Sequence, residues 1–562
     1  EMFKDGGQIT PTCGMGYPQA DIKKEDGFLY YIQETKSEFS YGVFAYTVLK
    51  KEFAEIYFTI KTSKDGDDFD RIAKEELKEA ARTGYDKLKE EHIKWWKKYW
   101  EKASLKINDE LLEKTYYRSW YLFASCSRMP LQGVWTADDG KIPPWRGDYH
   151  HDTNTQLSYQ AYLKADRLAE GEVFLDYLWN LKPRFEQFAN EFYGVDGLLI
   201  PGVSTIDGKP MGGWSQYALS PTMSIWVALS FDEYYLYTGD VLFLKEKAYP
   251  FFYEVGKAIM GLLEEKNGKL YLPLSTSPEI YDDTPEAYLI PNSNLALIRY
   301  LFVRLQEYSE ILNKEKTAYE EILSKLDEIA VIDGYIGLNR VERLKESHRH
   351  FSHLMCLYPL HLIHYDTKEH RELYKKALSE IEKLGTGMWV GFSFAMCAQL
   401  YAMAENGAGA YEKLRQFADG FVEENGFHLN GDYKQKGYST FHYRRFTLEA
   451  LFGFCDALQE MLLQEYRGYL HLFPAIPKQW ENEGIEFNGF RSYGGILVSG
   501  KIKNGYLSEI RLKIPEKMLI KIKNTFPTKR ARLETDKKTQ IIEETEGFFV
   551  LELEKGNAKI TG

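Results

Sequence analysis

The sequence predicts a mainly α protein in which an (α/α)6 barrel at residues 105–470 is flanked by two β regions. Helical segments follow one another through this range, and Gly, Pro, Trp and charged residues fill the stretches between them. About twelve helices joined in this way fit a double ring of helices. Their predicted starts lie near residues 109, 154, 170, 215, 241, 286, 314, 348, 368, 388, 408 and 445.

Residues 1–65 predict a partial β-sandwich, because three short segments are rich in β-branched and aromatic residues. A few strands do not bury both faces of a sheet alone, so this region is expected to be part of a larger sandwich. Residues 66–104 predict a helical linker, since their apolar residues recur three to four positions apart. The predicted strands are 28–33, 41–49 and 55–61, and the predicted linker helices are 70–81 and 85–96.

Residues 471–562 predict a small antiparallel β domain. The segments 496–502, 507–514 and 548–553 have strand composition. Lys503-Asn504-Gly505 supplies the residues that a tight hairpin turn prefers.

Composition and charge exclude several classes of function. The chain has 562 residues with 71 Lys+Arg and 83 Asp+Glu, and this net charge of -12 argues against a general nucleic-acid binder. No apolar run is long enough for a transmembrane helix, so no membrane partner is expected. The five cysteines lie far apart without a CxxC pair, which indicates neither a disulfide framework nor a zinc site. Free thiols, together with an N-terminus that lacks a signal-peptide pattern, favour a cytoplasmic location.

A polar loop at residues 132–156 contains the first candidate site residues. Asp152 and Asn154 are two positions apart, so in an extended segment they would point to the same side and could hold a water molecule. The alternative is helix capping by one of them. His150 and His151 are candidate binding residues, and adjacent histidines rarely share one metal ion.

Two glutamates occupy positions where a carboxyl group is unusual. Glu279 lies in a Pro-bounded, hydroxyl-rich stretch with apolar neighbours, which can raise a carboxyl pKa as a general acid requires. The alternative is a surface turn. Glu449 enters the last strong helix among apolar residues, where a charge is costly unless it is paired or used. The alternative there is a salt bridge with Arg444 or Arg445.

The segment 348–353 contains three histidines and one arginine, His348, Arg349, His350 and His353. His350 and His353 would share a face if this segment were helical. The zinc-protease pattern HExxH is absent. We expect a polar pocket wall that donates hydrogen bonds to ligand hydroxyls; a hydrogen-bonded histidine core or a metal site is the alternative.

Five ordered groups of residues together resemble one known family. They are Leu131-Gln-Gly-Val-Trp with Pro144-Trp and Asp152-Thr-Asn-Thr-Gln; Ser275-Thr-Ser-Pro-Glu; His348-Arg-His-Phe-Ser-His-Leu-Met-Cys-Leu-Tyr-Pro; Gly385-Thr-Gly-Met-Trp; and Phe446-Thr-Leu-Glu with Glu460-Met-Leu-Leu-Gln and His471-Leu-Phe-Pro-Ala-Ile-Pro. The resemblance is to glycoside hydrolase family 95, whose members are inverting exo-α-L-fucosidases and relatives. It implies the barrel architecture described above and a longer N-terminal sandwich than residues 1–65 provide.

The resemblance implies the roles of the site residues. Glu279 matches the general acid. Glu449 stands where the family has its aspartate base, and Asp152 and Asn154 stand where it has two asparagines, so either Glu449 or Asp152 could be the base. Trp135, Trp145, Trp214 and Trp389 are candidates for stacking on a sugar face or for core packing.

The implied substrate is a terminal α-L-fucoside or a related α-L-galactoside of an oligosaccharide, and neither a cofactor nor a metal is implied. Two alternatives are a phosphorylase on the same barrel and a catalytically silent carbohydrate-binding relative.

Overall fold

The computed structural model describes two compact units, the first ending at Lys102 and the second starting at Ala103. No helix in the described part of the chain is both long and apolar enough to cross a membrane. The described residues are 18, 20–35, 39–127, 129–132, 145, 147–211, 217, 219–277, 279–281, 286–287, 289–481 and 484–562.

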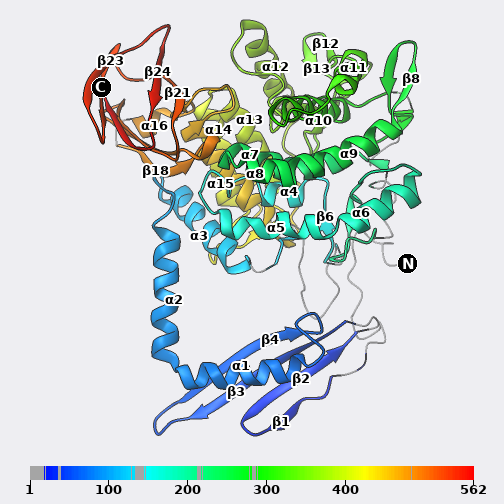
Figure 1. The fold of residues 1–562 in the computed structure, drawn as a ribbon, viewed down its shortest axis with the longest axis vertical. Helices are drawn as coiled ribbons and strands as arrows, with labels where there is room; N and C mark the ends of the chain where they lie inside the picture. Colours follow the sequence, from blue (N-terminus) through cyan, green and yellow to red (C-terminus); the bar gives the residue numbers. More distant parts are fainter. Residues whose placement is uncertain are drawn as a thin grey trace. The chain divides into compact units, whose positions relative to one another are not determined.

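The first unit is an antiparallel sheet with two helices (Figure 1). Its strands lie side by side in chain order, and they confirm the three strands predicted here. Both predicted linker helices are also confirmed. The elements are β1 (Lys23–Glu25), β2 (Phe28–Glu34), β3 (Ser40–Leu49), β4 (Ala54–Thr62), α1 (Phe69–Thr83) and α2 (Tyr85–Trp100).

Helix α1 covers one face of this sheet, and alternation along the strands decides which side chains it buries. The buried cluster consists of Phe28, Tyr30 and Phe44 from the sheet and Phe69, Ala73 and Leu77 from the helix side. Ile56, Phe58 and Ile60 alternate onto the opposite face of β4 and are exposed. Among the described residues up to Lys102 the strands form this one sheet, and the second layer of the predicted sandwich is not among them.

The second unit begins with a helix-rich part that extends to Leu462. Its helices are α3 (Glu110–Cys126), α4 (Asn154–Ser158), α5 (Leu168–Asn180), α6 (Lys182–Phe188), η2 (Ala189–Tyr193), α7 (Met223–Thr238), α8 (Val241–Phe243), η4 (Leu244–Ala248), α9 (Tyr249–Leu262), α10 (Asn292–Ile311), α11 (Thr317–Lys325), η5 (Ser352–Leu354), α12 (Lys368–Leu384), α13 (Gly391–Met403), α14 (Gly407–Gly420) and α15 (Glu449–Leu462).

Short strand pairs interrupt the helices and shape their connecting loops. They are β6 (Tyr149–His150) with β7 (Val203–Ser204), β8 (Glu264–Lys266) with β9 (Lys269–Tyr271), β10 (Leu274–Ser275) with β11 (Glu286–Ala287), β12 (Val331–Ile332) with β13 (Tyr335–Ile336), β14 (His428–Leu429) with β15 (Phe446–Thr447), and β16 (Leu463–Gln464) with β17 (His471–Leu472).

Some predicted helix starts are wrong. Near 348 the chain forms a loop followed by the single turn η5, because Nδ1 of His348 accepts the backbone N–H of His350 at 3.0 Å and so competes with helix formation. Near 286 the chain first forms β11, and α10 starts only at Asn292. The sequence analysis also missed α6, which has a proline in its first turn.

Helices α13 and α15 form the centre of this part. Helix α13 packs against α14 and α15, and α15 also contacts α3 and α4. Apolar residues lie on all sides of α13, as expected for a helix enclosed by others. Glu449 begins α15. Towards the other end of the same helix, Glu460 forms a buried ion pair with Lys164, which also lies 3.2 Å from Glu465.

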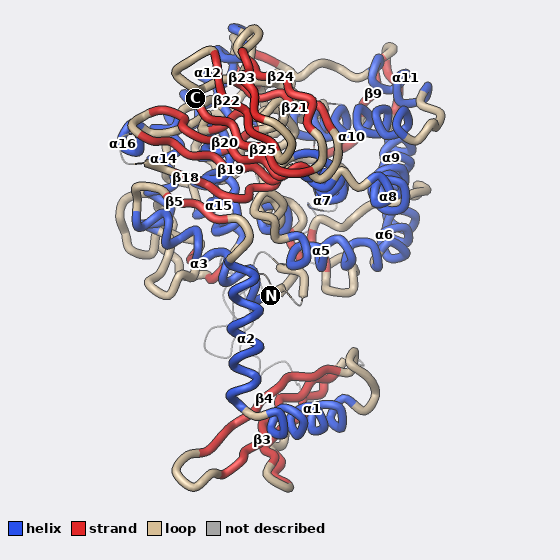
Figure 2. Tube along the Cα trace, turned by 60° about the vertical axis from the view of Figure 1, so that its left-hand side comes forward, coloured by secondary structure: helices blue, strands red, loops and turns tan. Residues whose placement is uncertain are grey.

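The second unit ends in an antiparallel sheet with the order β23-β22-β25-β20-β19-β18-β5 (Figure 2). Strand β5 (Ser104–Lys106) comes from the predicted linker boundary, so the sheet reaches outside 471–562. Arg491 joins the sheet to the helical part through Asp166 at 2.6 Å. The C-terminal elements are α16 (Lys478–Glu481), β18 (Glu486–Arg491), η6 (Tyr493–Gly495), β19 (Leu497–Lys503), β20 (Tyr506–Ile514), β21 (Met518–Lys523), β22 (Arg530–Thr535), β23 (Thr539–Glu543), β24 (Phe548–Leu553) and β25 (Gly556–Thr561).

Candidate active site

A cavity of about 270 Å³ in the second unit brings most of the predicted polar segments together. Its walls come from the loop before α4, from the segment around residue 279, from the loop after α11, and from the segment before α15. The lining residues are Trp145, His150, Asn154, Glu279, Arg349, His350, Phe392, Asn430, Phe441 and Tyr443.

Glu279 is held by three side chains. Arg349 forms an ion pair with it, Tyr217 donates its hydroxyl to it, and Nε2 of His350 lies 2.8 Å from its Oε2. Burial raises the pKa of Glu279, but His350, Arg349 and the Tyr217 hydroxyl outweigh burial and hold that pKa well below its usual value. The surface-turn alternative is therefore wrong.

The backbone of Glu279 is also unusual. Its φ of 52° lies in the left-handed region, which a residue with a side chain rarely adopts. Such a conformation persists where the surrounding contacts over-determine it, and it is common at functional sites. Here the strained backbone accompanies a carboxyl group that lines the cavity.

Strand β6 orients the polar residues of the first loop. Its pairing with β7 fixes Tyr149 and His150, and the ring of His150 then lies near both Asp148 and Asp152. Nδ1 of His150 lies 3.0 Å from Asp148, and Nε2 of His150 lies 3.6 Å from Asp152. Burial lowers the pKa of His150, but the charges of Asp152 and Asp148 outweigh it and raise the pKa to about 10. The contacts therefore favour the imidazolium form of His150, which lies buried between Asp148 and Asp152.

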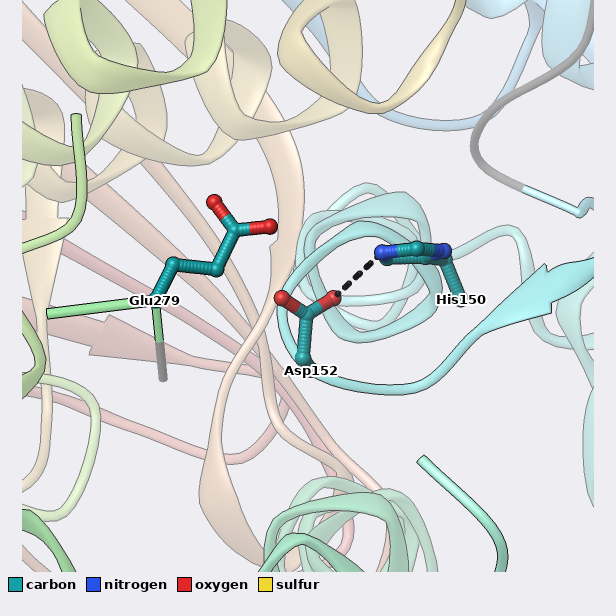
Figure 3. Close-up of side chains that lie close together, drawn as sticks. All are labelled: His150, Asp152 and Glu279. Atoms are coloured by element: carbon teal, nitrogen blue, oxygen red, sulfur yellow. Dashed lines mark ion pairs between the residues drawn. The ribbon is translucent and has the colours of Figure 1, made fainter. Parts of the chain in front are cut away.

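Asp152 faces Glu279 from the His150 side (Figure 3). Its side chain is 1% exposed, and neither carboxylate oxygen has a hydrogen-bond partner among the described residues. The capping alternative is wrong, because Thr153 occupies the N-cap position of α4 and forms no side-chain cap bond. Burial raises the pKa of Asp152, the His150 charge lowers it, and the Glu279 charge raises it again, so that it ends above its usual value.

Glu449 is fully buried at the first position of α15. The salt-bridge alternative is wrong for Arg444, which pairs with Glu423 at 2.7 Å. Neither Glu449 oxygen has a hydrogen-bond partner within the described part of the chain. Burial raises the pKa of Glu449 to about 8, against the opposing effects of Thr447 and Asn154. Because Asn154 lines the cavity, it connects this carboxyl with the cavity.

Other predicted binding residues lie outside the cavity lining. His151 contacts Thr155 at 3.0 Å and Ser204 at 3.2 Å on the far side of β6. Burial lowers the pKa of His353 to about 3 and that of His348 to about 4. Trp389 is 1% exposed and packs edge-on against Phe351 and Phe394. Trp135 and Trp214 lie outside the described residues.

Sequence reasoning missed several residues of the cavity. Phe441 and Tyr443 belong to the stretch that precedes Glu449. The sequence analysis considered only Arg444 and Arg445 there. Both Glu279 and Glu449 act electrostatically on Tyr443. Burial and the charges of these two carboxyls raise the pKa of its phenol to about 12. Its aromatic neighbours in an otherwise polar stretch were the available signal. Phe392 and Asn430 had no comparable signal.

His150, Asp152 and Glu279 also bring one ligand atom each to within 4.8 Å of one another, a spacing that suits a metal ion. Two observations favour a site without one. Both ring nitrogens of His150 face carboxyl groups whose charges favour its protonated form, and that form has no lone pair to donate. Arg349 already neutralises Glu279. The arrangement is instead that of an acid/base site.

Comparisons with known proteins agree with this chemistry. Residues 84–462 match the glycosyl hydrolase family 95 catalytic domain. Alpha-L-fucosidase 2 of Arabidopsis thaliana is 31% identical over 423 residues, covering 72% of this chain and 49% of that protein. The probable alpha-fucosidase A of Aspergillus niger is 24% identical over 488 residues, covering 75% of this chain and 58% of that protein. The chain thus spans about half the length of the curated relatives it matches.

Solved structures show the same fold at low identity. A protein assigned as a kojibiose phosphorylase, from the human microbiome, has a TM-score of 0.67 and 12% identity, covering 96% of this chain and 80% of that one. The α-L-rhamnosidase of Streptomyces avermitilis has a TM-score of 0.50 and 12% identity, covering 82% and 42%. These likenesses concern the fold alone. The family match extends over more than half of the sequence, and the chain therefore belongs to glycoside hydrolase family 95.

Proposed function

We propose that the chain is an inverting exo-glycosidase that removes a terminal α-linked sugar from an oligosaccharide, with an (α/α)6 barrel as its catalytic domain. The observation that carries the proposal is a polar cavity with two carboxyl groups. Glu279 lines the cavity and is paired with Arg349, and the buried Glu449 lies next to Asn154, which also lines the cavity. Glycosidases of this type need two carboxyl groups, one as acid and one as base.

In this mechanism Glu279 protonates the glycosidic oxygen of the leaving group. Asn154 positions a water molecule, and Glu449 accepts its proton as the water attacks the opposite face of the sugar. The raised pKa of Glu449, about 8, makes its anion a stronger base than an ordinary carboxylate. Arg349 stabilises the Glu279 anion that remains after proton transfer.

The sugar is an α-L-fucoside or the related α-L-galactoside. The names of the two curated relatives support this choice. Trp145 and Phe392 offer aromatic surface in the cavity wall, and a sugar face packs against such rings. Arg349, His350 and Asn430 offer polar atoms for hydroxyl groups.

A phosphorylase is the second candidate, because the microbiome protein of the same fold is assigned as one. A phosphorylase needs unpaired cations for phosphate. In the described part of this chain, Arg349 pairs with Glu279 and Arg444 pairs with Glu423, which favours water as the nucleophile.

A proton NMR time course tests the proposal. Wild type, Glu279→Gln and Glu449→Gln are incubated with α-L-fucosyl, α-L-galactosyl and other α-linked oligosaccharides, with and without inorganic phosphate. We expect one sugar to be released first as its β-anomer, independently of phosphate, and both variants to lose turnover. Release of a sugar phosphate would identify a phosphorylase. Binding without turnover would identify a silent carbohydrate-binding relative.

A further inference from the structure

Asp152 lies between Glu279 and His150 (Figure 3). Its position next to Glu279 suggests a role in controlling the proton of that carboxyl. Asp148 and Asp152 both lie beside the ring of His150, so the three side chains form one cluster. Asp148 is fully buried, and its Oδ2 lies 3.0 Å from Nδ1 of His150. This contact fixes the imidazole so that its other nitrogen faces Asp152 at 3.6 Å.

The closeness of Asp152 to Glu279 has an electrostatic consequence. One oxygen of Asp152 lies within 4.8 Å of one oxygen of Glu279, and Asp152 is almost completely buried. Two carboxylates this close repel when both are ionised, so the pair binds one proton more tightly than either group would alone.

The groups around the pair decide where this proton rests. Arg349, His350 and the Tyr217 hydroxyl all favour the Glu279 anion. Asp152 is faced by the charges of His150 and His350, and neither of its oxygens has a hydrogen-bond partner among the described residues. The stronger contacts of Glu279 therefore favour the shared proton on Asp152. Among the described residues, the charged or titratable groups that face the pair include Asp148, His150, Tyr217, His348, Arg349, His350 and Tyr443.

We propose that Asp152 and Glu279 form one acid pair that shares a single proton, and that Asp152 is a positioning residue of the acid instead of the base. This inference rests on the glycosidase function proposed above. It identifies the base as Glu449, and it makes Asp148 and His150 the supports of the acid pair.

The proton balance of the step is simple. As the bond between the sugar and the leaving oxygen breaks, the single proton of the pair passes from Asp152 to Glu279 and from Glu279 to that oxygen, which leaves both carboxyls ionised. The attacking water gives its proton to Glu449. After product release, Glu449 loses one proton to solvent and the acid pair regains one.

The separation of the carboxyls argues against Asp152 as the base. An inverting enzyme needs its acid and base roughly 6.5–9.5 Å apart, so that a water molecule and the sugar fit between them. The approach of Asp152 to within 4.8 Å of Glu279 leaves no such room.

Leaving-group dependence tests the inference. Phenyl and 2,4-dinitrophenyl glycosides of the sugar found in the NMR panel are compared in wild type and in Asp152→Asn, Glu279→Gln and Glu449→Gln. A dinitrophenolate leaves without protonation, so loss of an acid harms the phenyl glycoside far more. We expect Asp152→Asn to reduce kcat at least about tenfold on the phenyl glycoside but only slightly on the dinitrophenyl glycoside, as Glu279→Gln does.

Glu449→Gln serves as the base-side reference and should reduce kcat on both glycosides alike. Asp148→Asn should follow the Asp152→Asn pattern more weakly. Ser204→Ala, which removes contacts with His151 and Tyr177 away from the acid pair, should leave the leaving-group dependence unchanged. Equal losses on both glycosides in Asp152→Asn would overturn the inference and make Asp152 the base.

A second measurement does not depend on turnover. Thermal unfolding is followed for wild type, Asp152→Asn, Glu279→Gln and the double variant at about pH 5 and about pH 8.5. Because the two carboxyls repel only when both are ionised, the coupling between the substitutions should be larger at the higher pH. A coupling that does not change with pH would overturn proton sharing, whether or not any glycoside is hydrolysed.

Discussion

Nε2 of His350 lies 2.8 Å from Oε2 of Glu279, and Nδ1 of the same ring lies 3.0 Å from the Thr153 hydroxyl. One histidine thus connects the proposed acid with the N-cap residue of α4. The three segments that meet here are distant in the chain, so the contact exists only in the folded protein.

His350→Gln should raise the pKa of Glu279 towards its usual value, because His350 is one of the groups that lower it. The basic limb of the kcat/KM–pH profile should then move to higher pH, because Glu279 stays protonated up to a higher pH. His370→Gln removes a partly exposed histidine of α12 that contacts Asp366, and it should leave the profile unchanged. An unshifted limb in His350→Gln would contradict the electrostatic role of this contact.

Glu449→Gln should make the protein more stable than wild type above about pH 8. The folded pKa of Glu449 is raised to about 8 from an ordinary value of 4.5. A raised carboxyl pKa contributes stability that is present below the unfolded value and is lost as pH rises through the folded one. The loss is on the order of a few kcal/mol, at about 1.4 kcal/mol per pKa unit. Denaturant unfolding at about pH 5 and about pH 9 measures it, and a pH-independent difference would contradict the assignment.

Lys164→Met should destabilise the fold by about 3–5 kcal/mol, because it leaves Glu460 and Glu465 buried without their cation. Lys375→Met is the matched control, since its ion pair with Glu372 is exposed and is expected to contribute at most about 1 kcal/mol. Chemical denaturation of both variants decides the point. Similar effects in the two variants would show that burial of the Lys164 pair is unimportant.

Trp389→Ala and Trp145→Ala should separate core packing from substrate contact. Trp389 is 1% exposed, so its loss should cost about 3–5 kcal/mol of stability. Trp145 lines the cavity, so its loss should raise KM with little change in the unfolding midpoint. A raised KM with unchanged stability in Trp389→Ala would instead indicate that Trp389 stacks on the sugar.

Local patterns in the sequence were sufficient for much of the fold. The content of β-branched and aromatic residues predicted β2, β3 and β4, and helical periodicity predicted α1 and α2. Each of these signals depends on neighbours within one element. The helix expected near 348 was wrong because a side chain of the same segment takes over a backbone N–H, and periodicity does not report such competition.

The sequence by itself determined which residue types the site contains: Glu279, Asn154, Arg349 and His350 were candidates, and the cavity brings them together. Only the tertiary structure decided their electrostatics. The ion pair of Arg349 with Glu279 joins segments far apart in the chain, and the burial of the neighbouring residues Asp148, His150 and Asp152 depends on packing by other segments. A carboxyl pKa depends on distance and desolvation, which residue order does not encode locally.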